Sequence, residues 1–181
     1  MVKTLECAST VGSECKLDGL RDLAGRIDLN KPNGWWRFPT EPDFVQGFMG
    51  TSLFIVGDQP STSDWGDSNP NRRVFYDLLR QVGAGDAHLT DLYKRRDKAG
   101  SLRRALPEDF PEHVRFFREE LALLKPLRVV ALGRLAYQLL WDHVSEVRPN
   151  LSWMWHFAYV VRYNKKAFYE NNMRLAFGPP V

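Results

Sequence analysis

Cysteine is scarce in this sequence, which has only Cys7 and Cys15 among its 181 residues. Two thiolates are too few for a four-cysteine zinc or iron–sulfur site, so we expect no metal and no cofactor. The beginning of the chain also lacks the basic and then apolar layout of a secretory signal, which argues against a disulfide. We therefore expect a cytoplasmic protein, or a nuclear one if the source has a nucleus.

Long apolar runs are missing as well, because none approaches the roughly 18 residues that span a bilayer. No membrane partner is therefore expected. With 44% hydrophobic and 26% charged residues, the composition is that of a globular chain. The length fits a single domain over residues 1–181, with residues 1–50 as an irregular N-terminal extension packed on it. We expect this domain to be a monomer.

The net charge is only +3, so the overall balance says little about nucleic acid. Basic residues are instead concentrated in two stretches, with Lys94, Arg95, Arg96, Lys98, Arg103 and Arg104 in the first and Arg162, Lys165 and Lys166 in the second. Each stretch is either a solvated face or a phosphate-binding rim. Because both border candidate site loops, the rim is the favoured interpretation.

The pattern of apolar residues predicts alternating strands and helices. Short apolar runs predict strands at 53–56, 88–92, 128–132 and 158–161. Helical spacing predicts helices at 17–28, 72–83, 108–124, 133–143 and 164–176, and turn formers predict a loop at 61–71. Strands separated by helices pair in parallel through right-handed crossovers, so the pattern favours an α/β fold with a mainly parallel sheet.

Two polar half-motifs lie about a hundred residues apart. The first predicted strand runs directly into Gly57, Asp58 and Gln59, which places this acid at the carboxyl end of a buried strand. Ligands bind at that edge of open α/β sheets. His156 lies in the second half-motif, between Trp155 and Phe157. An acid at a strand end and a distant histidine suggest a catalytic cleft between two segments.

Five segments carry a family resemblance when taken in order. They are Gly57-Asp-Gln-Pro-Ser61, Phe75-Tyr-Asp-Leu-Leu-Arg-Gln-Val-Gly83, His88-Leu-Thr-Asp-Leu-Tyr-Lys-Arg-Arg96, Leu124-Lys-Pro-Leu-Arg-Val-Val-Ala-Leu-Gly-Arg-Leu-Ala136 and His156-Phe-Ala-Tyr-Val-Val-Arg162. This series resembles the uracil-DNA glycosylase superfamily over about residues 53–176. The nearest pattern is the bacterial and archaeal branch that usually carries an iron–sulfur cluster, where the first segment reads Gly-Glu-Ala-Pro-Gly and the last His-Pro-Ala-Tyr-Leu-Leu-Arg.

The chain departs from that pattern at several positions. It has two cysteines where the cluster needs four, so no cluster is expected. Ser61 replaces a Gly or Tyr, Phe157 replaces the Pro after the histidine, and Asp91 replaces the Asn that reads the base. Damage specificity therefore does not transfer directly from the family.

The resemblance implies a three-layer α/β/α sandwich with a short, mainly parallel four-stranded sheet. It also implies a DNA-repair enzyme, associated with the nucleoid or the nucleus. Such an enzyme flips a deaminated base such as uracil out of DNA and hydrolyses its N-glycosidic bond with an activated water. By position, the catalytic residues would be Asp58, Gln59 and His156. The base would be bound by Asp91, Trp65, Phe75, Ser61 and Gly57. The DNA backbone would meet Lys94, Arg95, Arg96, Tyr159, Arg162 and Lys165.

Each of these roles has a structural alternative. Asp58 would otherwise cap the turn after its strand, and His156 would pack among aromatic neighbours. Phe75 sits where a core residue is also expected, with Trp65 as the other stacking candidate. Asp91 is either protonated by burial, or reads a different base, or pairs with a neighbouring basic residue.

Two other functions are compatible with the residues. A relative that has lost catalysis would still recognise damage or single strands by stacking and phosphate contacts. Retention of both Asp58 and His156 favours the enzyme, whereas replacement of the Asn at position 91 favours the silent binder. A nucleotide-binding α/β protein is the third possibility, and the absence of a phosphate-cradling Gly-rich loop weakens it.

Overall fold

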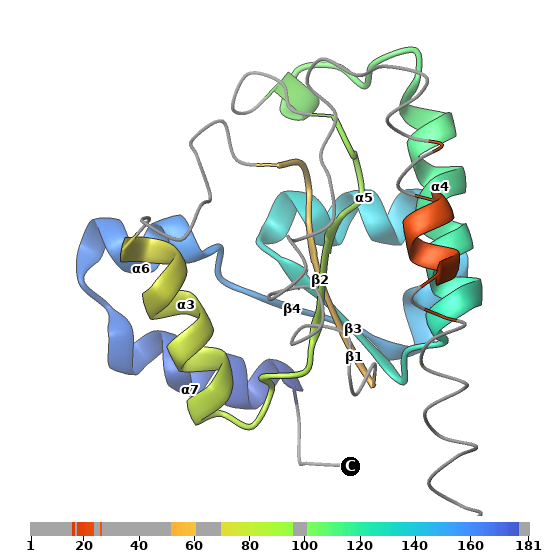
Figure 1. Cartoon of the computed structure of the whole chain (residues 1–181). Helices are drawn as coiled ribbons and strands as arrows, with labels where there is room; N and C mark the ends of the chain where they lie inside the picture. The colour runs from red at the N-terminus through yellow and green to blue at the C-terminus, as the bar shows by residue number, and fades with distance from the viewer. Residues whose placement is uncertain are drawn as a thin grey trace, which may run out of the picture.

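The computed structural model describes residues 16, 18–23, 26, 52–60, 70–95 and 101–177. Most of the expected N-terminal extension lies outside these residues, as do Ser61, Trp65 and Arg96. Residues 18–23 are helical, within the helix predicted at 17–28. Leu20 is fully buried there, and Arg26 forms a 2.6 Å ion pair with Glu119 of helix α4 (Phe110–Leu124). This N-terminal helix therefore packs beside α4, as Figure 1 shows.

A four-stranded, entirely parallel sheet lies at the centre of the described chain. Its strands are β1 (Leu53–Gly57), β2 (His88–Asp91), β3 (Arg128–Leu132) and β4 (Leu151–Met154), in the order β2-β1-β3-β4. The register pairs Gly57 with Asp91 and Leu132 with Met154. The α/β class and the short parallel sheet are therefore confirmed.

The fourth strand lies earlier in the chain than the sequence pattern indicated. A strand at 158–161 was the expectation, but these residues belong to helix α6 (Phe157–Tyr163). Phe157 and Val160 are buried three residues apart, which is the spacing of one helix face rather than of a strand. The paired segment is Leu151–Met154, whose partly exposed residues at the sheet edge masked its strand character.

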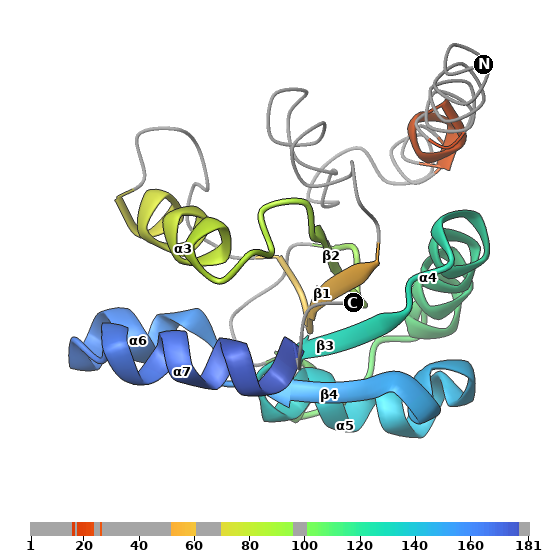
Figure 2. The ribbon, with the colours of Figure 1, turned by 90° about the horizontal axis from the view of Figure 1, so that it is seen from below.

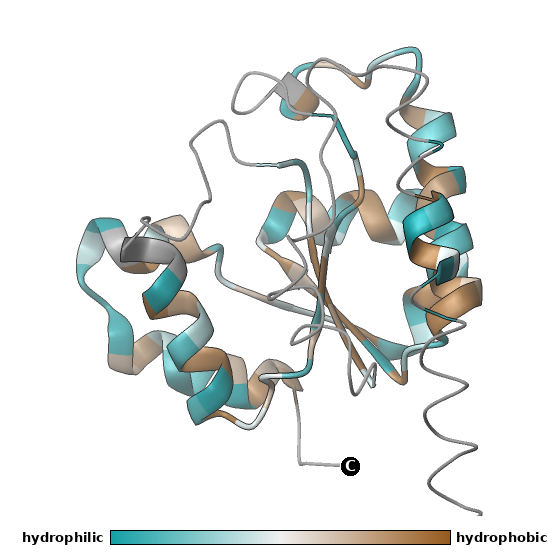
Figure 3. Ribbon diagram, in the orientation of Figure 1, coloured by the Kyte–Doolittle hydropathy of each residue, from teal (hydrophilic) through white to brown (hydrophobic). Residues whose placement is uncertain are grey.

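Helices cover both faces of the sheet because alternate strand residues point in opposite directions. Phe54, Val56 and Val129 belong to a core shared with α4 and with α5 (Arg134–His143). Leu53, Ile55 and Val130 belong to a second core, shared with α6, α3 (Pro70–Gln81) and α7 (Lys166–Phe177). Figure 2 shows α4 and α5 on one side of the sheet and α3, α6 and α7 on the other. In Figure 3 the strands are mainly hydrophobic, whereas hydrophilic (teal) and hydrophobic (brown) residues alternate along the helices.

Helix ends follow local chain chemistry. Helix α3 begins at Pro70, two residues before the predicted start, and Gly83 follows its end with a φ of 79°. Helix α4 ends at Leu124, where Lys125 adopts a left-handed conformation before Pro126. Short 3-10 turns occupy Ser101–Arg103 (η1) and Ser145–Asn150 (η2). No helix among the described residues is long and apolar enough to cross a membrane.

Candidate functional site

The carboxyl ends of all four strands meet at one edge of the sheet, because the strands are parallel. Asp91 is the last residue of β2, and Asp58 follows β1 directly. Gly133 follows β3, and His156 lies two residues after β4. The topology therefore brings together the acid and the histidine that the sequence placed on separate segments.

Backbone hydrogen bonds hold the two acidic strand ends beside each other. The N–H of Leu92 donates to the carbonyl of Gly57 at 2.9 Å, and the N–H of Tyr93 donates to that of Asp58 at 3.0 Å. The pairing of β1 with β2 thus continues past both strands. The Asp91 carboxylate lies over the Cα of Gly57, where a Cβ would overlap one of its oxygens. Gly57 therefore makes room for Asp91, and its direct contact with a base stays a prediction.

Asp58 is partly buried at this edge, and burial raises the pKa of its carboxyl. Hydrogen bonds from the backbone at Asp58 and Gln59, the electrostatic interaction with His156 and the positive charge of Arg103 all lower this pKa. These interactions place Asp58 within electrostatic reach of both His156 and Arg103. Gln59 is partly buried next to it.

His156 has a defined tautomer because it caps helix α6. The N–H of Ala158 donates to Nδ1 of the imidazole at 3.1 Å, so Nδ1 is unprotonated and Nε2 carries the hydrogen. Burial lowers the pKa of His156, Asp58 raises it and Arg103 lowers it further. The result is a neutral imidazole with Nε2–H as a donor.

The loop after β3 supports this histidine. Gly133 has a φ of 101°, a conformation that favours glycine, and its N–H donates to the carbonyl of Met154 at 2.8 Å. A Cβ at residue 133 would lie 3.3 Å from the Cβ of His156. A side chain at residue 133 would therefore crowd the histidine as well as strain the backbone.

Asp91 is a carboxyl whose pKa is strongly displaced. Burial raises its pKa to about 7, and the negative charges of Asp58 and Glu120 act in the same direction, while Lys94 opposes them. At neutral pH the protonated form of Asp91 is thus well populated. A protonated carboxyl has one O–H donor and a carbonyl acceptor, whereas the ionised form can only accept. Protonation by burial was one of the alternatives that the sequence left open.

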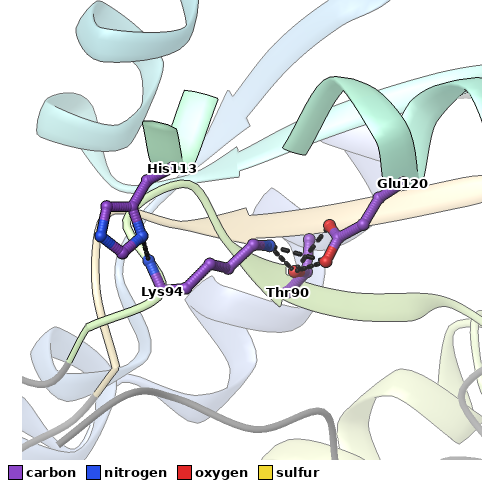
Figure 4. Close-up of polar contacts among 4 residues, drawn as sticks. All are labelled: Thr90, Lys94, His113 and Glu120. Atoms are coloured by element: carbon purple, nitrogen blue, oxygen red, sulfur yellow. Dashed lines mark hydrogen bonds and ion pairs between the residues drawn. The ribbon is translucent and has the colours of Figure 1, made fainter. Parts of the chain in front are cut away.

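Lys94 is buried inside the molecule, which argues against its expected DNA-binding role. Its side chain is fully buried, and Nζ forms a 2.7 Å ion pair with Glu120 and donates to Oγ1 of Thr90 at 2.6 Å (Figure 4). Thr90 Oγ1 also lies 2.9 Å from the other carboxylate oxygen of Glu120. The Lys94 backbone N–H donates to Nδ1 of His113 at 3.0 Å. The first basic stretch therefore begins inside the molecule.

The remaining predicted contacts fall into three groups. Arg95 is partly exposed and forms a 3.4 Å ion pair with Asp109, so its contact with phosphate stays a prediction. Phe75 is 4% exposed and packs in the core against Phe157, with ring centroids 5.1 Å apart, so the structure gives it the alternative core role. Tyr159 is partly exposed, and Arg162 and Lys165 are exposed beyond His156.

Two residues at this edge were missed by the sequence reasoning. Arg103, in η1, acts on both Asp58 and His156, although the sequence placed it only in a basic run. Glu120 is fully buried and neutralises Lys94. Its signal is visible in the sequence, because Glu120 lies three residues after Phe117 and four before Leu124, on the apolar face of the helix.

The best-defined hollow of the described residues lies away from the strand ends. A hollow of about 340 Å³ opens before α4 and is lined by residues such as Pro107, Phe110 and His143, none of them at the strand ends. Within the described part of the chain, no group of three histidine, cysteine or acidic side chains could hold a metal ion.

A scan against protein-family models finds no match for this chain, and a search of curated proteins finds none either.

Proposed function

We propose that this protein is a DNA glycosylase that hydrolyses the N-glycosidic bond of a flipped, deaminated base such as uracil. The proposal rests on the observation that Asp58 and a neutral His156 lie within electrostatic reach of each other at the carboxyl edge of the sheet. The resemblance of five ordered segments to the uracil-DNA glycosylase superfamily adds the class of substrate. Supporting features are the Nε2–H tautomer of His156 and the adjacent carboxyl of Asp91.

The two catalytic groups would act on opposite sides of the bond. Cleavage builds positive charge on the sugar and negative charge on the departing base. The Asp58 carboxylate would orient the attacking water and stabilise the oxocarbenium-like sugar. The Nε2–H of His156 would donate to a carbonyl oxygen of the base as charge gathers there. Preorganised donors of this kind contribute roughly 2.7–4 kcal/mol.

Arg103 would tune both groups in the direction that this mechanism needs. Its positive charge lowers the pKa of Asp58, which favours the carboxylate that must face the sugar. The same charge lowers the pKa of His156, which favours the neutral imidazole. A neutral donor suits this role because it needs no proton from solvent.

The test is excision from labelled oligonucleotides that carry uracil, hypoxanthine, xanthine or a thymine mismatch, followed by alkaline cleavage at abasic sites. We expect Asp58→Asn and His156→Ala each to slow single-turnover excision at least about tenfold, or roughly 1.4 kcal/mol in the barrier. DNA affinity should stay within a few fold. Asp142→Asn, an exposed carboxyl on α5, is the matched control and should keep full activity.

Two outcomes would contradict the proposal. Full activity in either variant would remove that residue from the mechanism. Binding of DNA without any abasic product, on all four substrates, would favour the catalytically silent damage-binding protein instead.

A further inference from the structure

Exposed aromatic side chains gather on one part of the surface. Five large aromatic residues are exposed among the described residues, and four of them lie between residues 153 and 168. The exposed fractions are 41% for Trp153, 38% for Trp155, 53% for Tyr163 and 49% for Phe168. Such a concentration is unusual for a solvent-facing surface and marks an interaction site.

These rings contact one another in a continuous series. Trp155 and Tyr159 are stacked, with centroids 4.8 Å apart and planes at 24°, and Tyr159 lies 4.7 Å from Tyr163. Trp153 and Phe168 flank Trp155 at 5.7 and 6.5 Å. The series follows α6 because positions four residues apart share one face of a helix. We call these five residues the aromatic ladder.

The ladder is held in place by the neighbouring helix. The backbone N–H of Trp155 donates to Oδ1 of Asn172, on α7, at 2.8 Å. Phe157 and Val160, on the buried face of α6, anchor that helix in the core. Rings fixed before binding lose less conformational entropy when a partner arrives. The ladder is therefore a preorganised surface.

Positive charge surrounds the ladder. Three basic side chains are exposed where α6 leads into α7: Arg162 near the end of α6, Lys165 in the turn and Lys166 at the start of α7. The only acidic residue between residues 151 and 177 is Glu170, which pairs with Arg174 at 2.9 Å. The surface thus combines exposed rings with cations that form no ion pair with another described residue, and this combination complements a polyanion that has exposed flat groups.

The ladder also adjoins the candidate site. Trp155 precedes His156 in sequence, and Tyr159 donates its backbone N–H to the carbonyl of His156 at 2.9 Å. A partner that lies along the ladder would lead directly to the strand ends that carry His156 and Asp58. Helices α6 and α7, which carry Tyr159, Tyr163 and Phe168 of the ladder, form one end of the molecule in Figure 2.

We propose that the aromatic ladder binds single-stranded nucleic acid, with bases stacked on exposed rings and phosphates held by Arg162, Lys165 and Lys166. Sequence-tolerant single-strand binding uses this combination of aromatic faces and cations. A duplex hides its base faces, so the ladder favours unpaired strands. This inference deepens the proposed function. The idea that a bound single-stranded nucleic acid is also a substrate rests on the glycosylase proposal, whereas binding of an undamaged single strand does not depend on that proposal.

The experiment measures fluorescence anisotropy with an undamaged, labelled oligothymidylate of about 15 nucleotides and with a matched duplex. We expect tighter binding of the single strand. Trp155→Leu and Tyr163→Leu, tested separately, should each weaken it at least about fivefold because a stacking ring is lost. Replacing Arg162, Lys165 and Lys166 with Ala should flatten the slope of log affinity against log salt by about 0.7 per lost contact.

Trp141→Leu is the matched control. Trp141 is 44% exposed, stacks on Tyr137 at 24° and has Arg148 5.4 Å from its ring, but it lies on α5, on the other face of the sheet. This variant should bind as the unchanged protein does. Thermal melting by circular dichroism verifies that each variant is folded, and Tyr163, at the exposed end of α6, is the least disruptive position.

Three results would overturn the inference. The first is that the duplex binds as tightly as the single strand or more tightly. The second is that Trp155→Leu and Tyr163→Leu, both folded, keep the affinity of the unchanged protein for the single strand. The third is that Trp141→Leu loses as much affinity as the ladder variants do. Concentration-dependent sedimentation that Tyr163→Leu abolishes would instead assign the ladder to a second copy of the chain. Single-strand binding without excision would leave the ladder assigned and reject the glycosylase, so the two proposals fail separately.

Discussion

At Asp91, burial and the neighbouring carboxyls raise the pKa to about 7, which would couple base recognition to pH in the proposed glycosylase. A neutral carboxyl can accept from N3–H of uracil and donate to O4, as an amide does. The ionised form presents a second lone pair to O4 and repels it. In the proposed function, the proton on Asp91 would therefore decide whether this residue complements uracil.

We accordingly expect excision of uracil to decline as the pH rises through about 7, because Asp91 loses its proton there. Asp91→Asn, which keeps a donor and an acceptor at every pH, should abolish this decline and exceed the unchanged protein at pH 8. Single-turnover rates on uracil, hypoxanthine and cytosine substrates between pH 6 and 8.5 check this. An identical base preference and pH profile in the two proteins would exclude Asp91 as the base reader.

The same titration affects stability independently of any enzymatic activity. In the unfolded chain an aspartate titrates near pH 3.9, so the folded state retains a proton that the unfolded state releases between about pH 4 and 7. Stability contributed by Asp91 is thus lost as the pH rises through that window. Asp91→Asn should melt at a higher temperature than the unchanged protein at pH 8, and the difference should shrink toward pH 4.

At the scale of elements, the buried ion pair of Lys94 with Glu120 joins the end of β2 to the middle of α4. Burial lowers the pKa of Lys94 and raises that of Glu120, while each charge favours the ionised form of the other. Thr90 contributes a further hydrogen bond. Removal of one partner leaves the other charge buried without compensation.

Glu120→Gln should therefore lower the free energy of unfolding by about 3–5 kcal/mol, measured by urea denaturation. The double change Lys94→Met with Glu120→Leu should recover much of that loss, because neither charge of the pair remains. Glu146→Gln is the matched control, since Arg118 and Glu146 also lie 2.7 Å apart but are exposed. Its effect should stay below about 1 kcal/mol. Equal losses in the buried and exposed pairs would refute this account.

At the scale of the whole molecule, the two hydrophobic cores share a single sheet, since β1 contributes Phe54 to one and Ile55 to the other. We expect them to unfold together. Phe117→Ala on α4 and Leu78→Ala on α3, both fully buried, should each lower one common transition by about 2–5 kcal/mol. Far-ultraviolet circular dichroism and tryptophan fluorescence should give coincident urea curves. Two separate transitions would mean that the faces fold as independent units.

Much of this architecture could be predicted from the sequence because apolar periodicity reports burial directly. The first three strands and the helices near 72–83, 108–124 and 133–143 lie close to their predicted ranges. The fourth strand was missed because Leu151–Met154 is a sheet edge with little burial, whereas Val160 and Val161 look like strand residues in a helix.

The candidate site was only partly predictable for a related reason. Asp58 and Asp91 lie at the ends of predicted strands, so their place at one edge could be inferred from topology. His156 lies before the strand predicted at 158–161, so its position after β4, at the same edge, could not be inferred in this way. The burial of Lys94 could not, because a basic run in sequence does not show which of its members turns inward toward Glu120. The influence of Arg103 on Asp58 depends on a loop path that carries no periodic signal.

The parallel order β2-β1-β3-β4 also has a consequence for the growing polypeptide. Asp58 and Asp91 are synthesised well before β4 and His156, and every strand pair joins segments that are distant along the chain. Contacts of such long sequence separation form late in folding. A nascent chain that ends before residue 151 would therefore carry both carboxyls without the histidine donor. If the proposed glycosylase chemistry takes place at this edge, it would begin only once the last strand has docked.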